Sequence, residues 1–176
     1  MKLISQSDID CVFNNLDNLG YCCEIISRYD KNACDDAGFS LAMIVTLTND
    51  IPLINYAFNT LQLNFLACDN YGYTPLHLAA KFNKLEACKY LCKACPELID
   101  LKTNSGYSVL HCAVGFAELK LITYLIESQH ADIYSTSLSG RTIEYFVQNN
   151  PSDDVKNYTS SLFITERTIN ETAFNI

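Results

Sequence analysis

The sequence predicts an all-α solenoid built from stacked helix-turn-helix units, and three observations lead to this fold class. Four glycines recur at one interval of 34 residues: Gly38, Gly72, Gly106 and Gly140. A hydroxyl residue follows each of them by two positions: Ser40, Thr74, Ser108 and Thr142. After each hydroxyl, apolar residues recur at the spacing of amphipathic helices. A period of this length is typical of proteins whose repeated units stack on one another.

The recurring pair of residues has a physical reason in each unit. Glycine permits a turn with a positive φ angle, and a Ser or Thr placed just after the turn can cap a helix by accepting a backbone N–H. Pro75 follows Thr74 at the first helical position, where its missing N–H costs nothing. We therefore expect a tight turn and a helix start at each repeat.

The two N-terminal units follow the pattern more loosely. Residues 7–13 and 21–26 form a candidate helix pair without the glycine turn, which indicates an N-terminal cap of the array. Residues 40–45 and 51–57 supply the two helices of the second unit.

The third and fourth units carry the clearest pattern. Small alanines at Ala79, Ala80 and Ala113 on the first helix would allow a second helix to approach closely. One helix pair cannot cover its own apolar face, so neighbouring units must stack to form a core.

The fifth unit differs in its surface and leads into one last helix. Glu144 stands where the other units have an apolar residue, which indicates a C-terminal cap that faces water. Pro151 and Ser152 start the last helix, with Val155 and Phe163 on its apolar side. We expect one domain over residues 1–168, with a tail over residues 169–176. Its units are predicted at about 1–34, 35–68, 69–102, 103–136 and 137–168.

A known family matches this register. Residues 69–80, Asp-Asn-Tyr-Gly-Tyr-Thr-Pro-Leu-His-Leu-Ala-Ala, resemble the ankyrin-repeat signature, and residues 105–114 are a softer copy. The resemblance implies an ankyrin-repeat solenoid of about five units joined by short β-hairpins. It also implies that His77 and His111 organise the turns by hydrogen bonding, rather than acting in catalysis or metal binding.

A narrower resemblance concerns the last repeats. Residues 125–136 carry an additional residue relative to the common unit, and residues 139–146 lack the Pro-Leu-His element. Both traits are similar to inhibitor-of-NF-kappa-B proteins, including the insect Cactus branch, which hold Rel transcription factors in the cytoplasm. The sequence has no Asp-Ser-Gly-x-x-Ser element and no strongly acidic tail. In that respect it resembles the viral ankyrins of parasitoid-wasp viruses, and a role between virus and host is implied.

Composition and charge limit the possible partners. The formal net charge is -8, which disfavours nucleic acid and favours a partner with a basic segment. No apolar run is long enough to span a bilayer, and the first residues are too polar for a secretory signal. We expect a cytoplasmic or nuclear protein that is monomeric when free.

Catalytic and metal sites are not indicated by the motifs. The cysteines Cys88, Cys92 and Cys95 have a spacing that occurs in zinc sites, but their helical positions favour packing as small hydrophobic residues. No phosphate-binding loop, Ser-His-Asp arrangement or zinc-protease helix is present. We expect no enzyme activity, no cofactor and no bound metal, and keep a hidden zinc site as an alternative to be tested.

The ankyrin resemblance implies that a partner contacts the hairpin tips and the inner surface of the first helices. The register then predicts eight partner-binding residues: Phe39, Tyr71, Tyr73, Lys81, Phe82, Tyr107, Phe116 and Arg141. Exposed aromatic rings and arginine are enriched at binding hot spots. The alternative is that the rings pack between units. For Tyr73 and Tyr107 we favour binding, and for Phe82 and Phe116 both readings stay open.

The predicted function is protein binding without catalysis, with a Rel-homology transcription factor as the specific candidate partner. An unrelated ankyrin adaptor or effector that recruits another protein is the alternative.

Overall fold

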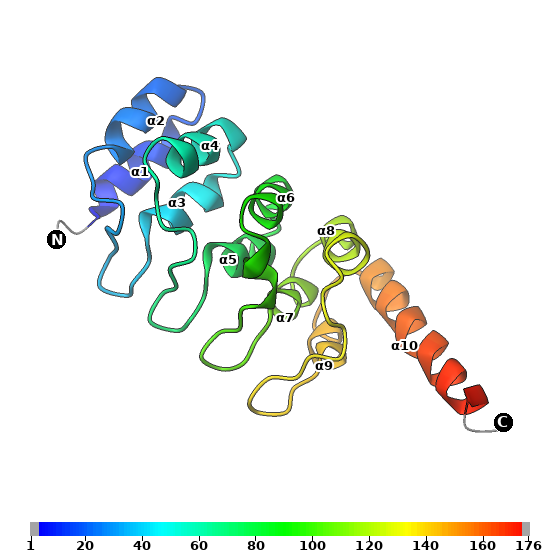
Figure 1. Cartoon of the computed structure of the whole chain (residues 1–176). Coiled ribbons are helices and arrows are strands. Elements are labelled where there is room, and N and C mark those ends of the chain that lie inside the picture. Colours follow the sequence, from blue (N-terminus) through cyan, green and yellow to red (C-terminus); the bar gives the residue numbers. More distant parts are fainter. Residues whose placement is uncertain (1–3, 174–176) are drawn as a thin grey trace.

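The computed structural model describes the backbone of residues 4–173 and the side chains of residues 4–164. In the described part the chain is helical and contains no β-strand. Successive helix pairs lie side by side along the molecule, with long loops projecting from one edge (Figure 1). The helices are α1 Gln6–Asn14, α2 Leu19–Ile26, α3 Leu41–Thr48, α4 Ile51–Asn59, α5 Pro75–Lys81, α6 Leu85–Ala94, α7 Val109–Val114, α8 Leu119–Thr123, α9 Ile143–Val147 and α10 Asp153–Ala173, with a short 3-10 helix η1 at Pro96–Asp100 and a π-helical segment η2 at Tyr124–Ser128.

The helices form two layers. The inner layer holds α3, α5, α7 and α9, each in contact with the next, and the outer layer holds α2, α4 and α6 in the same way. Within a unit, the inner helix packs on the outer helix that follows it. Each helix therefore covers part of a neighbour's apolar face, as the sequence pattern predicts.

The predicted helix caps are confirmed. The side chains of Ser40, Thr74, Ser108 and Thr142 each accept a hydrogen bond from the backbone N–H three residues ahead. Pro75 occupies the first turn of α5. The four inner helices thus begin where the hydroxyl residues place them.

The glycine turns are also confirmed. The φ angles of Gly38, Gly72, Gly106 and Gly140 lie between 75° and 83°. The connections predicted as β-hairpins contain only isolated antiparallel bridges within the described residues, at Cys34–Ser40, Lys102–Ser108 and Thr136–Thr142. We call these projecting connections fingers. Adjacent fingers are joined by backbone hydrogen bonds, for example from the Asn104 N–H to the Tyr71 carbonyl at 3.0 Å.

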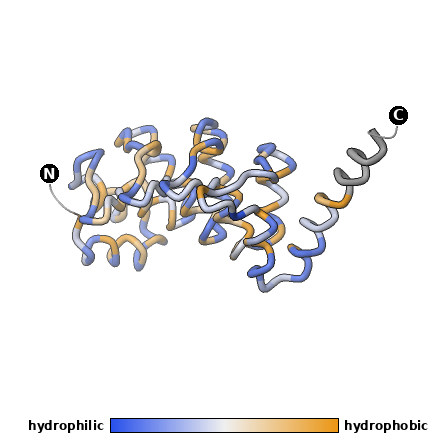
Figure 2. Tube along the Cα trace, turned by 90° about the horizontal axis from the view of Figure 1, so that it is seen from below, coloured by the Kyte–Doolittle hydropathy of each residue, from blue (hydrophilic) through white to orange (hydrophobic). Residues whose placement is uncertain are grey.

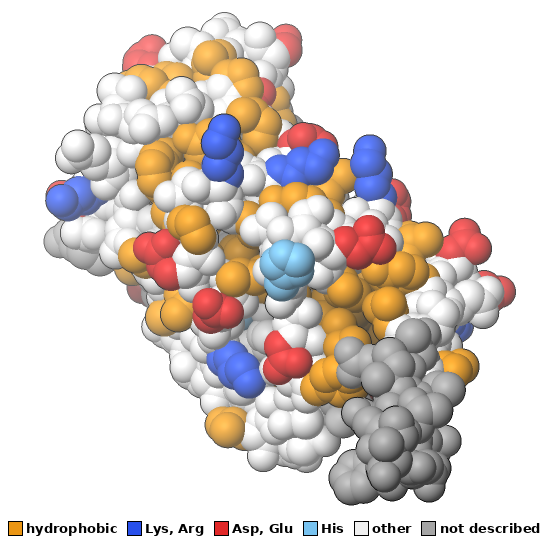
Figure 3. Space-filling view, turned by 45° about the vertical axis from the view of Figure 1, so that its right-hand side comes forward, with side chains coloured by type: hydrophobic (Ala, Val, Ile, Leu, Met, Phe, Trp, Pro, Cys, Tyr) orange, Lys and Arg blue, Asp and Glu red, His pale blue; other side chains and the backbone are white. Residues whose placement is uncertain are grey.

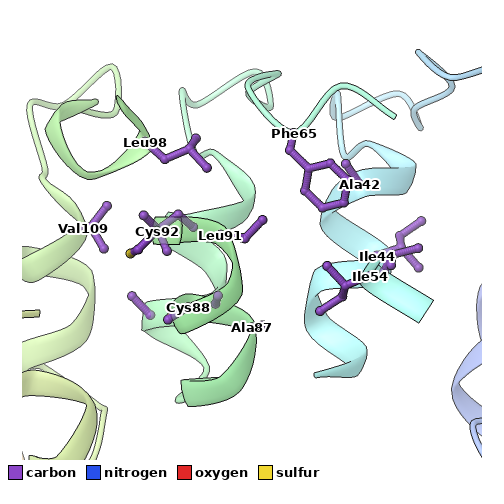
Figure 4. Packing of buried hydrophobic residues seen from close by; sticks show 14 of the residues in the cluster. Ala42, Ile44, Ile54, Phe65, Ala87, Cys88, Leu91, Cys92, Leu98 and Val109 are labelled. Carbon is purple, nitrogen blue, oxygen red and sulfur yellow. The ribbon is translucent and has the colours of Figure 1, made fainter. Parts of the chain in front are cut away.

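The hydrophobic core runs between the layers along the array. Leu91, Leu98 and Ile54 are fully buried, and cysteine side chains fill gaps between the larger residues (Figure 4). Ala79, Ala80 and Ala113 are also fully buried, which fits the close approach of helices predicted from their small size. Hydrophobic and hydrophilic positions alternate along the helices, as expected for helices with one buried face (Figure 2).

The ends of the array follow the sequence pattern in part. Glu144 is exposed, as expected for a terminal unit. Val155 is fully buried, and α10 contacts both α8 and α9 before it extends away from the array (Figure 1). The α10 backbone stays helical to Ala173, across the predicted boundary at 168, and residues 174–176 of the predicted tail lie outside the described residues. A search of the described helices finds none that is both long and apolar enough for a membrane span.

Candidate protein-binding surface

Six of the eight predicted partner-binding residues lie close together on the inner helices and finger bases, where they share contacts or line one hollow. We call them the inner-face surface: Tyr73, Lys81, Phe82, Tyr107, Phe116 and Arg141. The other two lie apart. Phe39 is half-buried and packs against the core, and Tyr71 is 67% exposed on the finger that precedes α5.

Phe82 and Phe116 are the most accessible aromatic rings of this surface. Phe82 follows α5 and is 53% exposed, whereas Phe116 follows α7 and is 69% exposed. They stand 34 residues apart, so they occupy equivalent places on successive units. Their exposure leaves room for a partner, while Tyr73 and Tyr107 are half-buried.

Lys81 brings a positive charge to the rings of the third unit. Its Nζ lies 5.5 Å from the ring centroid of Tyr73 and 5.6 Å from that of Phe82. Both distances are within the range of cation–π attraction. Burial raises the pKa of the Tyr73 phenol, so the ring stays neutral beside the ammonium group at neutral pH.

Tyr107 has a packing role as well as an accessible edge. Its ring meets Phe146 edge to face at 5.2 Å, and its hydroxyl accepts a hydrogen bond from Arg141 at 3.4 Å. The Arg141 guanidinium also lies 5.2 Å from the centroid of Tyr145. Removal of Tyr107 would therefore disturb the contact between the fourth and fifth units.

The two turn histidines connect successive units through the backbone. The His77 Nδ1 lies 3.3 Å from the Thr74 N–H that donates to it, and its Nε2 lies 3.1 Å from the Tyr107 carbonyl. His111 repeats both contacts with Ser108 and Arg141. Burial lowers the pKa of His77 to about 4 and also lowers the pKa of His111. Both rings are therefore neutral at pH 7, as the backbone-linking role requires.

A shallow hollow of about 120 Å³ opens at the centre of the inner-face surface. Its lining residues are Tyr73, Lys81, Tyr107, His111, Cys112, Phe116 and Phe146. They include one cation and no carboxylate. The hollow therefore suits an apolar side chain, and an acidic group on the same partner could reach Lys81 at the rim.

Sequence reasoning missed Cys112 and Phe146 as part of this site. Both stand six residues after a repeat glycine, at equivalent places on α7 and α9. The 34-residue register could have identified them, because side chains at one register position line up when units stack. Tyr145, beside Arg141, was missed as well.

The two cysteines of α6 and Cys95, which caps its C-terminal end, are placed for packing. Cys88, Cys92 and Cys95 are 0%, 4% and 8% exposed. Burial raises the pKa of the Cys88 thiol strongly and that of Cys92 to about 11, so both are protonated at neutral pH. Thiolates are the form that binds zinc. Over the described residues, no group of three His, Cys, Asp or Glu side chains is arranged to hold a metal ion.

Charged side chains elsewhere are dispersed. Figure 3 shows acidic and basic groups scattered over one face, with hydrophobic side chains gathered between them. The three ion pairs found among the described residues each join residues three or four positions apart along one helix or its end. They are Arg28–Glu24, Lys89–Glu86 and Lys156–Asp153. They do not involve the inner-face surface.

The repeats of this chain match a known protein family. A family model described as ankyrin repeats (3 copies) matches residues 9–100 and 43–137, which together cover more than half of the chain. No match was found among curated proteins.

Proposed function

We infer, because this chain belongs to the ankyrin-repeat family, that it binds another protein through the inner-face surface. Ankyrin repeats generally mediate protein–protein interaction and are typically non-catalytic. The observation that carries the proposal is the pair of exposed rings, Phe82 and Phe116. Phe116 lines the hollow, and Phe82 lies against Lys81, which lines it as well. Exposed aromatic residues that cluster beside a pocket are typical of binding hot spots.

The proposal includes the organisation of the chain. Residues 1–168 form a single domain of five helical units, of which the first and last are caps. The inner helices supply the binding surface, and the free protein is a monomer located in the cytoplasm or the nucleus. Alignment of Tyr73 with Tyr107 and of Phe82 with Phe116 on successive units supports an extended surface that takes a segment of the partner.

The specific partner we propose is a Rel-type transcription factor, which the chain would retain in the manner of an inhibitor-of-NF-kappa-B or viral ankyrin protein. Two observations support it: the additional residue in 125–136 and the altered start of the fifth unit at 139–146. The net charge of -8 would speed the encounter with a basic segment of such a partner.

A second candidate is an ankyrin adaptor or effector that binds a protein of a different class. The charges nearest to the exposed rings favour it. Lys81 and Arg141 flank the aromatic residues, and no carboxylate lines the hollow. This local arrangement suits a segment that carries an acidic side chain next to an apolar one.

The test is a calorimetric titration of a purified Rel-homology dimer with the wild-type chain and with two variants. Phe82→Ala combined with Phe116→Ala should weaken binding by about 2–4 kcal/mol, because it removes the two accessible rings. Leu66→Ala is the matched control, since Leu66 is a large apolar residue that is 45% exposed outside the inner-face surface. It should bind as the wild type does.

The outcomes separate the two candidates. Saturable binding that depends on Phe82 and Phe116 supports the Rel-type partner. Absence of binding by the folded wild type would exclude it and leave the adaptor. If a partner binds, Lys81→Glu shows whether the partner segment beside Lys81 is basic or acidic. The affinity of the variant should rise for a basic segment and fall for an acidic one.

A further inference from the structure

A second hollow, distinct from the inner-face surface, lies between the connections that precede α7 and α9. Its volume is about 150 Å³, and it lies where the end of η1 meets the segment after η2. We call it the inter-unit hollow. Its polar lining includes Asp100, Lys102, Asp132 and Ser135, and Ile99 and Ala131 form an apolar wall. A cavity of about 150 Å³ has room for a group the size of benzene.

The hydroxyl of Ser135 is the first indication of a missing ligand. Ser135 is only 5% exposed, and its Oγ is buried without a hydrogen-bond partner among the described residues. A buried polar group left without a partner destabilises the folded state. A hydrogen-bond donor that enters the inter-unit hollow would remove this cost.

The second indication is the pair of carboxylates in the same hollow. Asp132 uses one oxygen to accept the Tyr134 N–H at 2.9 Å, which leaves its other oxygen for a ligand. The described ion pairs involve neither Asp132 nor Asp100. Two carboxylates and one hydroxyl oxygen are acceptors suited to a cationic head group with several N–H donors.

We propose that the inter-unit hollow binds an arginine side chain of a partner protein. The guanidinium offers five donors in a fixed plane to Asp100, Asp132 and Ser135, and the apolar wall of Ile99 and Ala131 covers the methylene stem. The inference rests on the proposed protein-binding function and adds a contact for a basic residue outside the inner-face surface. It agrees with the net charge of -8.

Lys102 has a defined part in this proposal. It lines the same hollow, so its ammonium group opposes the entry of a second cation. Replacement of Lys102 by methionine keeps the apolar stem and removes the charge. The variant Lys102→Met should therefore bind an arginine side chain more tightly than the wild type.

The test uses the full chain and N-acetyl-arginine methylamide as the probe, followed by amide NMR shifts. Saturable shifts should centre on residues 99–102 and 131–135, and the neutral isostere N-acetyl-citrulline methylamide should produce none at the same concentration. Asp100→Asn with Asp132→Asn should weaken binding by about tenfold or more, since both charge partners are lost. Asp154→Asn, at an exposed carboxylate of α10, is the matched control and should leave it unchanged.

The results that would overturn the proposal are equally defined. Equal shifts from the citrulline probe or unchanged affinity in the double variant would show that the carboxylates do not recognise the arginine charge, and an absence of local shifts would show that the hollow does not bind the probe; each result overturns the proposal. Because no partner protein is used, this outcome is independent of the inner-face surface. Failure of the Rel-homology titration, in turn, leaves the probe experiment intact.

Discussion

His77 and His111 each join a helix start to the next unit along the chain. One ring nitrogen accepts a hydrogen bond from the capping residue, and the other donates to a carbonyl 30 residues further on. The geometry requires neutral rings, and burial supplies them by lowering the pKa of both side chains. Protonation would convert the accepting nitrogen into a donor and break the cap.

This network predicts that stability falls in mild acid. The pKa of His77 is about 4 in the folded chain and 6.5 in the unfolded chain, so the unfolded state takes up a proton first as pH falls below 6.5. The free energy of unfolding should drop by about 2 kcal/mol between pH 7 and pH 5 from His77 alone. Urea denaturation at the two pH values measures it.

The variant His77→Gln isolates the contribution of His77 to the pH dependence of stability. His77→Gln should be less stable at pH 7 but should lose less on acidification than the wild type. His130→Asn, at an exposed loop position, is the control for removing a histidine. An identical pH 7 to pH 5 difference in the wild type and in His77→Gln would show that His77 is not the titrating group.

Single residues were predictable where one side chain meets one backbone group. The caps at Ser40 and Thr74 and the positive φ angles of the repeat glycines are local features, so their positions in the register determined them. The accessibility of Phe82 compared with Tyr107 depends on which neighbours cover each ring. That comparison needed the packing of α5, α7 and α9, which no local pattern contains.

The fingers are the elements in which backbone conformation and stacking depend on the same residue. A Cβ on Gly72 would lie 2.5 Å from the backbone N of Asn104 in the next finger, and the φ angle is +83°. Gly140 has a similar φ angle of +75°, but a Cβ there meets no atom within 4 Å. Alanine substitution at Gly140 therefore measures the cost of the backbone strain alone, whereas substitution at Gly72 adds the cost of the clash with the next finger.

Alanine at these two positions should have different effects. Gly140→Ala should cost about 1–2 kcal/mol, because an L-residue is strained at positive φ. Gly72→Ala carries the same strain and should cost about 1–3 kcal/mol more, because the adjacent finger must shift. Urea denaturation of both variants gives the difference, and equal losses would mean that the fingers do not approach each other as described.

The sequence predicted the helices better than the connections between them. Caps and apolar spacing indicated both helices of each unit, because helix formation depends on residues three and four apart. The connections were predicted as β-hairpins, and the described residues show isolated bridges instead. Pairing stops after one bridge because helices flank the Lys102–Ser108 pair closely: η1 ends at Asp100 and α7 begins at Val109.

Across the whole molecule, the two proposed contacts take different chemical groups. The inner-face surface presents rings beside Lys81 and Arg141, whereas the inter-unit hollow presents carboxylates from Asp100 and Asp132. A partner that uses both would carry an apolar residue at one place and an arginine at another. Net charge alone predicts only the second of these contacts.

The central claim is that Phe82 and Phe116 bind a partner and can be removed without loss of the fold. Affinity capture from cell extract, quantified by mass spectrometry, tests it with three immobilised chains: wild type, Phe82→Ala with Phe116→Ala, and Leu66→Ala. All three should give helical circular dichroism spectra and melting temperatures within about 4 °C, since the changed residues are exposed. The same proteins should be enriched by the wild type and Leu66→Ala and be lost from the double variant. Equal enrichment by all three folded chains would contradict the account, because the partner would then bind elsewhere on the molecule.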